Sequence, residues 1–183
     1  MLIAITGKKE SGKTTFANFL KEEIESRHTI VRILSFSSAL KQMLETAEIC
    51  SYKELYEEKT NFSRDMLQKI GTNIIRNQID EEFWTKRMRA RILGLREAKP
   101  PCTIIIDDVR FVNEEAMVRE FGGTIIKMVR NWLENSDKHR SETEMAYISE
   151  DILIQNDFSL SLLKEKAQIV RRKLEDAGTR EII

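Results

Sequence analysis

The residues between positions 7 and 14 have the types and spacing of a loop that binds phosphate groups. The string Gly7-Lys8-Lys9-Glu10-Ser11-Gly12-Lys13-Thr14 matches the pattern G-x-x-x-x-G-K-[ST] at every fixed position. The glycines let successive backbone N–H groups face a phosphate, while the Lys13 ammonium can reach phosphate oxygens and the Thr14 hydroxyl can ligate Mg²⁺. The segment therefore predicts a nucleotide site formed by Gly7, Lys9, Ser11, Gly12, Lys13, Thr14 and Thr15.

Two adjacent acids, Asp107 and Asp108, are a second source of metal ligands. They directly follow the apolar run Thr103–Ile106, which is typical of a parallel strand buried on both faces. An acid at the end of a strand near such a phosphate loop can complete a Mg²⁺ site. We expect one of the two acids to do so, and the pattern does not decide which. Capping of the following turn is the alternative for the pair.

A phosphate-bearing acceptor would need positive charge beyond Lys13, because it brings a second anion against the nucleotide. Arginine suits this task because its planar guanidinium binds phosphate oxygens in pairs. The candidates are Arg64, Arg76, Arg110, Arg130, Lys138 and Arg140. For any one of them taken alone, a solvated side chain without a ligand is an equally good interpretation.

Strand patterns and helix patterns alternate along most of the chain. Strands are predicted at about residues 1–6, 29–36, 103–108, 124–129 and 152–154. Helices are predicted at about 14–26, at 38–48, from Asn113 as the N-cap to Gly122-Gly123, from Ser141 to Ser149, and over 163–174. This alternation predicts an α/β fold of three layers, the P-loop NTPase fold. A mostly parallel sheet would carry helices on both faces and ligands at the carboxyl ends of its strands.

The middle of the chain, from about Tyr52 to Glu97, has helical patterns but no strand pattern. Arg64–Asn77 and Glu81–Arg96 are two predicted helices, and Pro100-Pro101 ends the region. We interpret residues of about 50–100 as a helical insertion inside a single domain that spans residues 1–183. An insertion in this place can close over a small acceptor and exclude water.

The composition is that of a folded globular protein, with 41% hydrophobic and 33% charged residues over 183 positions. The 30 Lys and Arg residues balance the 30 Asp and Glu residues, so no overall field favours nucleic acid as a partner. No stretch approaches the roughly 20 apolar residues that cross a bilayer. Together with two isolated cysteines, Cys50 and Cys102, and no basic leader, this predicts a cytoplasmic protein without a membrane partner.

The phosphate loop alone does not identify the group that receives a phosphoryl. The guanine-reading string NKxD and the switch string DxxG of GTPases are both missing from the sequence. The small size and the helical insertion favour a kinase with a small acceptor. Two alternatives stay open: a kinase for another acceptor, such as a phosphomevalonate-like molecule or a nucleoside, and a nucleotide-binding module without catalysis.

Besides the phosphate loop, five stretches of the chain resemble the deoxynucleoside monophosphate kinases best known from tailed bacteriophages. They are Ser35–Lys41, Arg64–Thr72 continuing to Arg76, Asp108–Phe111 followed by Asn113-Glu114, His139–Glu142, and Ile154–Asp157. The string Asp108-Val109-Arg110-Phe111, together with the Asn113-Glu114 that follows it, is the most diagnostic. The chain departs from the family pattern at Ser38-Ala39, where Asp-Pro is usual, and at Arg140, where Pro is frequent.

The resemblance implies that ATP and a dNMP react to give ADP and a dNDP, with Mg²⁺, in a single P-loop kinase domain with a short lid at about 131–141. The catalytic residues that it implies are Lys13, Asp108, Arg110 and Arg130. Those at the acceptor would be Lys41, Arg64, Gln68, Arg76, Trp84, Arg110, His139 and Arg140. For Trp84, packing in the core is the favoured alternative, and His139 could equally orient the lid.

The partners follow from the same resemblance. The resemblance makes the dNMP substrate the expected partner, whereas it is the balanced charge that argues against nucleic acid. The number of subunits is open, with a homodimer as one option. If the chain is viral, the host cytoplasm is the expected location.

Overall fold

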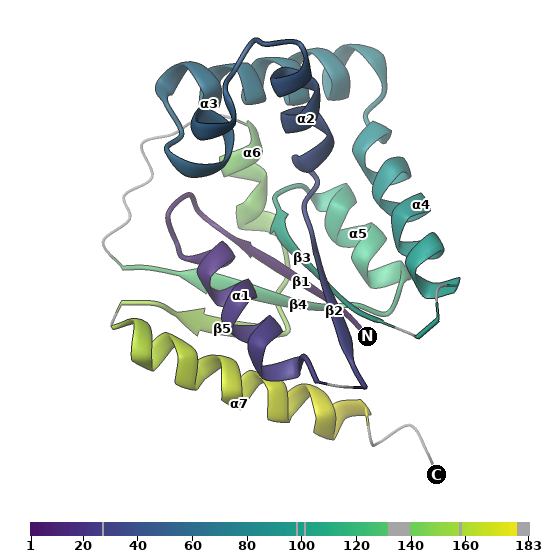
Figure 1. Cartoon of the computed structure of the whole chain (residues 1–183), viewed down its shortest axis with the longest axis vertical. Helices are drawn as coiled ribbons and strands as arrows, with labels where there is room; N and C mark the ends of the chain where they lie inside the picture. Colours follow the sequence, from purple (N-terminus) through teal and green to yellow (C-terminus); the bar gives the residue numbers. More distant parts are fainter. Residues whose placement is uncertain (27, 98, 101, 132–139, 158, 179–183) are drawn as a thin grey trace.

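The computed structural model describes all residues except 27, 98, 101, 132–139, 158 and 179–183. A parallel sheet lies at the centre (Figure 1), and its five strands are β1 (Leu2–Gly7), β2 (Ile30–Leu34), β3 (Cys102–Val109), β4 (Thr124–Val129) and β5 (Ile152–Gln155). The strand order is β2-β3-β1-β4-β5, and all pairings between neighbours are parallel. The apolar runs of the sequence form these strands, as predicted.

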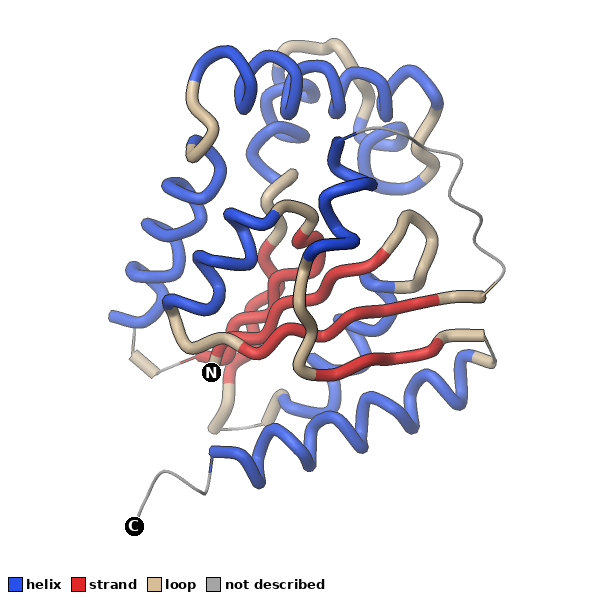
Figure 2. The backbone as a smooth tube through the Cα atoms, turned by 180° about the vertical axis from the view of Figure 1, so that it is seen from behind, coloured by secondary structure: helices blue, strands red, loops and turns tan. Residues whose placement is uncertain are grey.

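Helices cover both faces of the sheet, because successive strand residues point to opposite sides. On one face α1 (Lys13–Ile24) packs beside α7 (Leu160–Gly178), and on the other lie α4 (Phe83–Glu97) and α5 (Val112–Glu120). Within β3, the Ile105 side chain packs in the core beneath α1 and α7, whereas Ile104 and Ile106 pack in the core beneath α4 and α5. Figure 2 shows the same layers from behind. The predicted three-layer α/β architecture is confirmed.

Four helical segments between β2 and α4 lie beyond one end of the sheet, at the top of Figure 1. They are α2 (Ser38–Thr46), η1 (Lys53–Glu57), α3 (Asn61–Gln68) and η2 (Lys69–Ile79), of which η1 and η2 are π-helical. Because all strands are parallel and α2 directly follows β2, this end is the carboxyl edge of the sheet. Parallel sheets bind their ligands at that edge.

The predicted helix over Arg64–Asn77 is divided in the structure. α3 ends at Gln68, and the chain continues as the π-helix η2. The Gly71 carbonyl accepts a hydrogen bond from the Trp84 indole N–H at 2.9 Å, so η2 is bonded to α4 as well as within itself. Single π-helical turns occur frequently at functional sites.

The prediction of Asn113 as the N-cap of its helix was wrong. The N-cap is Phe111, two residues earlier, so α5 begins at Val112 and Asn113 lies in its first turn. The Glu114 carboxylate accepts the backbone N–H groups of Arg110 and Phe111 at 2.8 and 3.2 Å. These bonds take the place of a side-chain cap.

The helix predicted over 141–149 was too long. The structure has a short α6 (Arg140–Thr143) followed by the 3₁₀ turn η3 (Glu144–Tyr147). Ile148 is buried against the sheet, and the Asp151 N–H bonds to the Ile125 carbonyl at 2.9 Å, which leaves room for only a short turn before β5. The lid expected at about 131–141 falls mainly on 132–139, outside the described residues. Within the described ranges, the structure has no helix of the length and apolar character that would span a membrane.

Candidate active site

A cleft of about 900 Å³ lies where the carboxyl ends of the strands face α3 and η2. Most of the residues singled out in the sequence line it: Lys9, Gly12, Lys13, Thr14, Thr15, Lys41, Arg64, Gln68, Arg76, Trp84, Asp107, Asp108, Arg110 and Arg130. Gly7 and Ser11 belong to the loop that forms one wall. Arg140 lines a smaller neighbouring cavity of about 320 Å³, and Lys138 and His139 lie outside the described residues.

The phosphate loop depends on two glycines with positive φ, 143° at Gly7 and 93° at Gly12. A Cβ atom on Gly7 would lie 2.4 Å from the carbonyl oxygen of Met128. A Cβ atom on Gly12 would lie 2.3 Å from Nδ2 of Asn156. The loop backbone therefore packs directly against the ends of β4 and β5, and glycine is required both for its conformation and for its size.

The charge of Lys13 is held inside this loop. Its ammonium donates to the carbonyl of Gly7 at 2.6 Å and to that of Lys8 at 2.7 Å. α1 begins at Lys13, so the first N–H groups and the positive end of the helix dipole face the same place. A polyphosphate bound there would meet a lysine and a helix N-terminus together.

Asp107 lies beside the loop and has an oxygen that suits a cation. The Thr14 hydroxyl donates to Oδ2 of Asp107 at 3.3 Å, and Oδ1 is buried with no hydrogen-bond partner among the described residues. Burial, together with the charge of Asp108, raises the pKa of Asp107 to about 6. The described residues contain no group of three His, Cys, Asp or Glu that could hold a metal ion alone. Mg²⁺ in a nucleotide site needs only one or two protein oxygens besides phosphates and water, so Thr14 and Asp107 fit it.

Asp108 is bonded differently, although it adjoins Asp107. Its carboxylate accepts the hydroxyl of Ser35 and the backbone N–H groups of Phe36 and Ser37, the last two at 2.7 and 3.0 Å. All three donors belong to the segment between β2 and α2. Asp108 thus fixes this segment, while Asp107 faces the phosphate loop.

Positive side chains from three other segments line the cleft: Lys41 of α2, Lys59 before α3, and Arg110 after β3. The sequence interpretation missed Lys59, which has no motif around it. Lys59 is at the solvent-exposed rim, yet surrounding protein atoms lower its pKa, and the positive charges of Lys41 and Arg110 lower it further. Cations that repel one another in this way would be stabilised by an anion between them.

Arg64 connects this group to the phosphate loop. Its Nη2 atom lies 3.7 Å from Oε1 of Glu10, and its Nε–H donates to the carbonyl of Lys59 at 3.2 Å. The helices beyond the sheet and the phosphate loop therefore form two walls of one cleft. One wall suits a polyphosphate, and the other suits a second, smaller anion.

Comparison with known proteins agrees with this arrangement. The family model described as deoxynucleotide monophosphate kinase matches residues 24–167, which is well over half of the chain. The chain belongs to this family. It is therefore a nucleotide kinase, and the resemblance noted in the sequence is confirmed.

Relatives of this kinase occur in a mimivirus and in phages. A protein of Acanthamoeba polyphaga mimivirus, named as a candidate deoxynucleotide monophosphate kinase, is 31% identical over an alignment of 176 residues, and the match covers 86% of this chain and 89% of that protein. The deoxynucleotide monophosphate kinase of Escherichia phage RB69 is 28% identical over 130 residues, which are 68% of this chain and 53% of the phage protein.

Solved structures support the fold of the kinase. A dephospho-CoA kinase from Campylobacter jejuni superposes with a TM-score of 0.52 at 17% identity, covering 97% of this chain and 98% of that one. Kti12 of Chaetomium thermophilum, in complex with ADP-AlF3, superposes with a TM-score of 0.50 at 14% identity and the same coverage. At these identities the likeness shows the three-layer P-loop fold alone.

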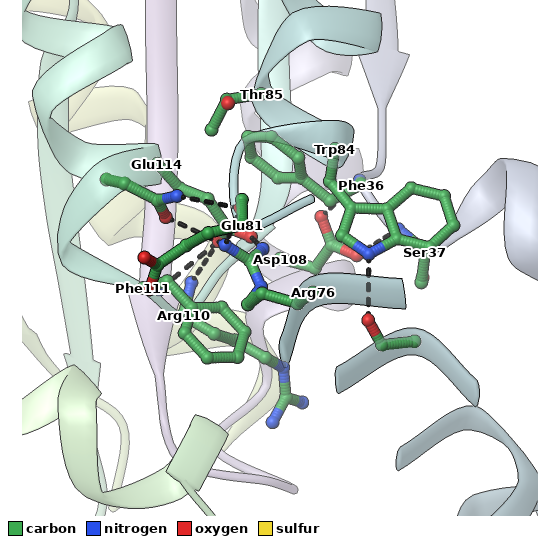
Figure 3. A network of polar contacts seen from close by, with 12 residues as sticks. Phe36, Ser37, Arg76, Glu81, Trp84, Thr85, Asp108, Arg110, Phe111 and Glu114 are labelled. Carbon is green, nitrogen blue, oxygen red and sulfur yellow. Dashed lines mark hydrogen bonds and ion pairs between the residues drawn. The ribbon is translucent and has the colours of Figure 1, made fainter. Parts of the chain in front are cut away.

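Arg76 of the kinase is buried and bonded within the protein (Figure 3). Its Nη2 lies 2.6 Å from Oε1 of Glu114, and its Nη1 donates to Asn113 Oδ1 at 2.9 Å and to the Glu81 carbonyl at 3.2 Å. The guanidinium also lies 3.8 Å from the centre of the Phe111 ring. The sequence interpretation did not assign Glu114 to the site. Its only local signals are its place in the string that follows Arg110 and in the first turn of a helix.

Two further residues expected at the acceptor have bonds within the kinase itself. The Trp84 ring is buried in the core beside Phe83, so the core packing favoured from the sequence is confirmed, although part of the residue still lines the cleft. The Arg140 guanidinium donates to Asn77 Oδ1 at 2.8 Å and to Glu81 Oε1 at 2.7 Å. Arg140 thus ties α6 to the end of η2.

The far side of the phosphate loop is supported from β4 and β5. Arg130, directly after β4, lies beside Gly12, with Nη2 3.7 Å from the position that a Cβ atom on this glycine would take. Asn156, directly after β5, donates from Nδ2 to the Ser11 carbonyl at 2.9 Å. The sequence interpretation missed this contact, for which a polar residue at the end of a strand is the only local signal.

Proposed function

We propose that this kinase transfers the γ-phosphoryl group of ATP to the phosphate of a deoxynucleoside monophosphate. One observation carries the proposal: a single cleft holds a complete phosphate loop on one side and the cations Lys41, Arg64 and Arg110 on the other. The family to which the chain belongs supports the same substrate class.

The donor nucleotide binds along Gly7–Thr15. Backbone N–H groups of the loop and of the first turn of α1 surround the phosphates, and Lys13 reaches the β and γ oxygens. Thr14 and Asp107 would hold Mg²⁺, which neutralises charge on the β and γ phosphates. The buried, unbonded Oδ1 of Asp107 supports this assignment over Asp108, whose oxygens are bonded to the segment before α2.

The acceptor phosphate binds among the cations of the opposite wall, with Lys41, Arg64 and Arg110 in direct contact and Gln68 beside them. An acceptor phosphate is already an anionic nucleophile, so no general base is needed. The protein accelerates the transfer by positioning the acceptor phosphate and by stabilising the negative charge on the transferring group. The buried position of Arg76 favours an indirect role for this residue.

Arg110 and Arg130 stabilise the charge on the transferring group. Arg110 enters the cleft directly after the two acids, and Arg130 lies beside Gly12. Guanidinium groups placed where charge develops in a phosphoryl transfer are worth several kcal/mol of activation free energy, which is on the order of 10²–10³ in rate. Asp108 acts indirectly in this scheme, by fixing the segment that leads to Lys41.

The test is steady-state formation of ADP from ATP and Mg²⁺ with each deoxynucleoside and ribonucleoside monophosphate in turn. We expect turnover that depends on an added dNMP, and a fall in kcat of about 10² or more in both Lys13→Ala and Arg110→Ala. Arg172→Ala, at an exposed position of α7, is the matched control and should keep full activity. ADP formation that is the same without any monophosphate, or an active Lys13→Ala variant, would contradict the proposal.

A further inference from the structure

A buried ion pair joins two parts of the active site that are far apart in the sequence. Arg76 lies on η2, one of the helices beyond the sheet, and Glu114 lies in the first turn of α5. The side chains are 2% and 3% exposed, and Arg76 Nη2 is 2.6 Å from Glu114 Oε1. The pair is therefore a direct link between the acceptor side of the cleft and the sheet.

The second oxygen of Glu114 holds the turn that carries Arg110. Oε2 accepts the backbone N–H of Arg110 at 2.8 Å and that of Phe111 at 3.2 Å. The Phe111 ring in turn lies under the Arg76 guanidinium. In Figure 3 the Arg110 side chain extends away from this network, so Glu114 holds its backbone and leaves its guanidinium to the cleft.

Burial makes it costly to replace either member of this ion pair alone. Removing one member of a buried ion pair leaves an uncompensated charge away from water, which is strongly unfavourable. Asn113 adds a second bridge, because it accepts from Arg76 Nη1 and donates to Glu82 Oε1 at 2.9 Å. Replacing such a pair with apolar residues often costs no stability, so stability alone does not account for this one.

We propose that Glu114 is a positioning residue that sets the Arg110 turn and the acceptor-side helix η2 in one fixed relation. This rests on the proposed function, because Arg110 acts there on the transferred or acceptor phosphate. Glu114 borders the cleft, but its side chain is only 3% exposed and its oxygens are bonded within the protein. It acts through two partners, the backbone of Arg110 and the guanidinium of Arg76.

The test compares Glu114→Gln with Glu120→Gln. Glutamine keeps the shape and an acceptor oxygen at position 114 but removes the charge that pairs with Arg76. Glu120 is the matched control: it is on the same helix and pairs with Arg89 of α4 at 2.6 Å, but both side chains are exposed. For each variant kcat, the KM for ATP and the KM for the best dNMP are measured well below its melting temperature.

We expect Glu114→Gln to lower kcat by about tenfold or more and to raise the KM for the dNMP, because small displacements of positioned groups cost up to about 10²-fold in rate. The KM for ATP should stay within about twofold, since the phosphate loop is built from other segments. Arg76→Met should give the same pattern, and the double variant should lose no more than the worse single one, because both changes break one link. Glu120→Gln should behave as wild type.

A Glu114→Gln enzyme with a lower melting temperature but unchanged kcat and dNMP KM would overturn the proposal and make Glu114 merely structural. If this variant does not fold, Asn113→Ala tests the same link more mildly, and unchanged kinetics there would equally overturn it. Failure of the proposed function is separate, because it would show in the wild type as an absence of dNMP-dependent turnover.

Discussion

Replacement of Gly12 by alanine tests how tightly the phosphate loop is built against the last strands. Gly12 has φ 93°, which L residues rarely adopt, and its backbone abuts Asn156. An alanine Cβ atom would lie 2.3 Å from Asn156 Nδ2, far inside contact distance. Asn156 is buried and bonded to the Ser11 carbonyl, so it cannot withdraw without breaking that bond.

Two costs add to give the expected loss of stability. A left-handed conformation costs an L residue about 1–2 kcal/mol. Displacing Asn156 leaves a buried donor and a buried carbonyl unsatisfied, at about 1–3 kcal/mol. We expect Gly12→Ala to lower the free energy of unfolding by about 2–5 kcal/mol in total, which at about 2–4 °C per kcal/mol corresponds to roughly 4–20 °C in Tm.

Urea denaturation followed by circular dichroism measures this loss, and two other glycines calibrate it. Gly122 has φ 68° with no atom within 4 Å of an added Cβ, so Gly122→Ala should lose only the conformational part, about 1–2 kcal/mol. Gly94 lies in α4, also with open space, so Gly94→Ala should gain about 0.5–1 kcal/mol. In a double-mutant cycle, Asn156→Ala should remove part of the Gly12→Ala cost. A Gly12→Ala loss no larger than that of Gly122→Ala would refute the steric argument.

The remaining predictions concern the metal site. Asp107→Asn should raise the Mg²⁺ concentration needed for half-maximal ADP formation by about tenfold or more, as loss of even an outer ligand partner typically costs 10–100-fold in metal affinity. Asp108→Asn should leave that concentration nearly unchanged; equal effects of the two variants would contradict the separate roles. The pKa of Asp107 is raised to about 6, so a proton competes with Mg²⁺ below that pH. Titrations of activity with Mg²⁺ should therefore give an apparent Mg²⁺ affinity that is constant above about pH 6 and falls about tenfold per pH unit below it. An unchanged Mg²⁺ affinity at pH 5 would rule out proton competition at Asp107.

The parts of this fold that depend on short stretches of sequence were predictable. The apolar run before Asp107 forms a central strand, and the spacing of Gly7, Gly12 and Lys13 forms the loop before α1. Each of these features is determined by neighbouring residues, through burial on both faces of a strand or through backbone freedom in a turn. They needed no knowledge of the rest of the chain.

The parts that depend on pairing across the chain were not predictable in the same way. Glu114 is one of two adjacent acids in the first turn of a helix, and neither gives a sign that Arg76, 38 positions earlier, will be buried against Glu114. Adjacent strand residues point to opposite sides, so Asp107 and Asp108 were bound to differ, but the sequence does not say which of them turns toward Thr14. Lys59 likewise lies near Lys41 and Arg110 only because the fold brings α2, the start of α3 and the end of β3 together.

The hydrogen bond from Asn156 to Ser11 spans 145 positions. During synthesis the first strand and its loop leave the ribosome long before this asparagine does, and contacts of such separation are slow to form. The loop therefore receives its last support only when β5 has docked at the edge of the sheet. Nascent chains that end before β5 would lack this hydrogen bond. Tight binding of ATP would therefore indicate that the sheet has formed up to its last strand.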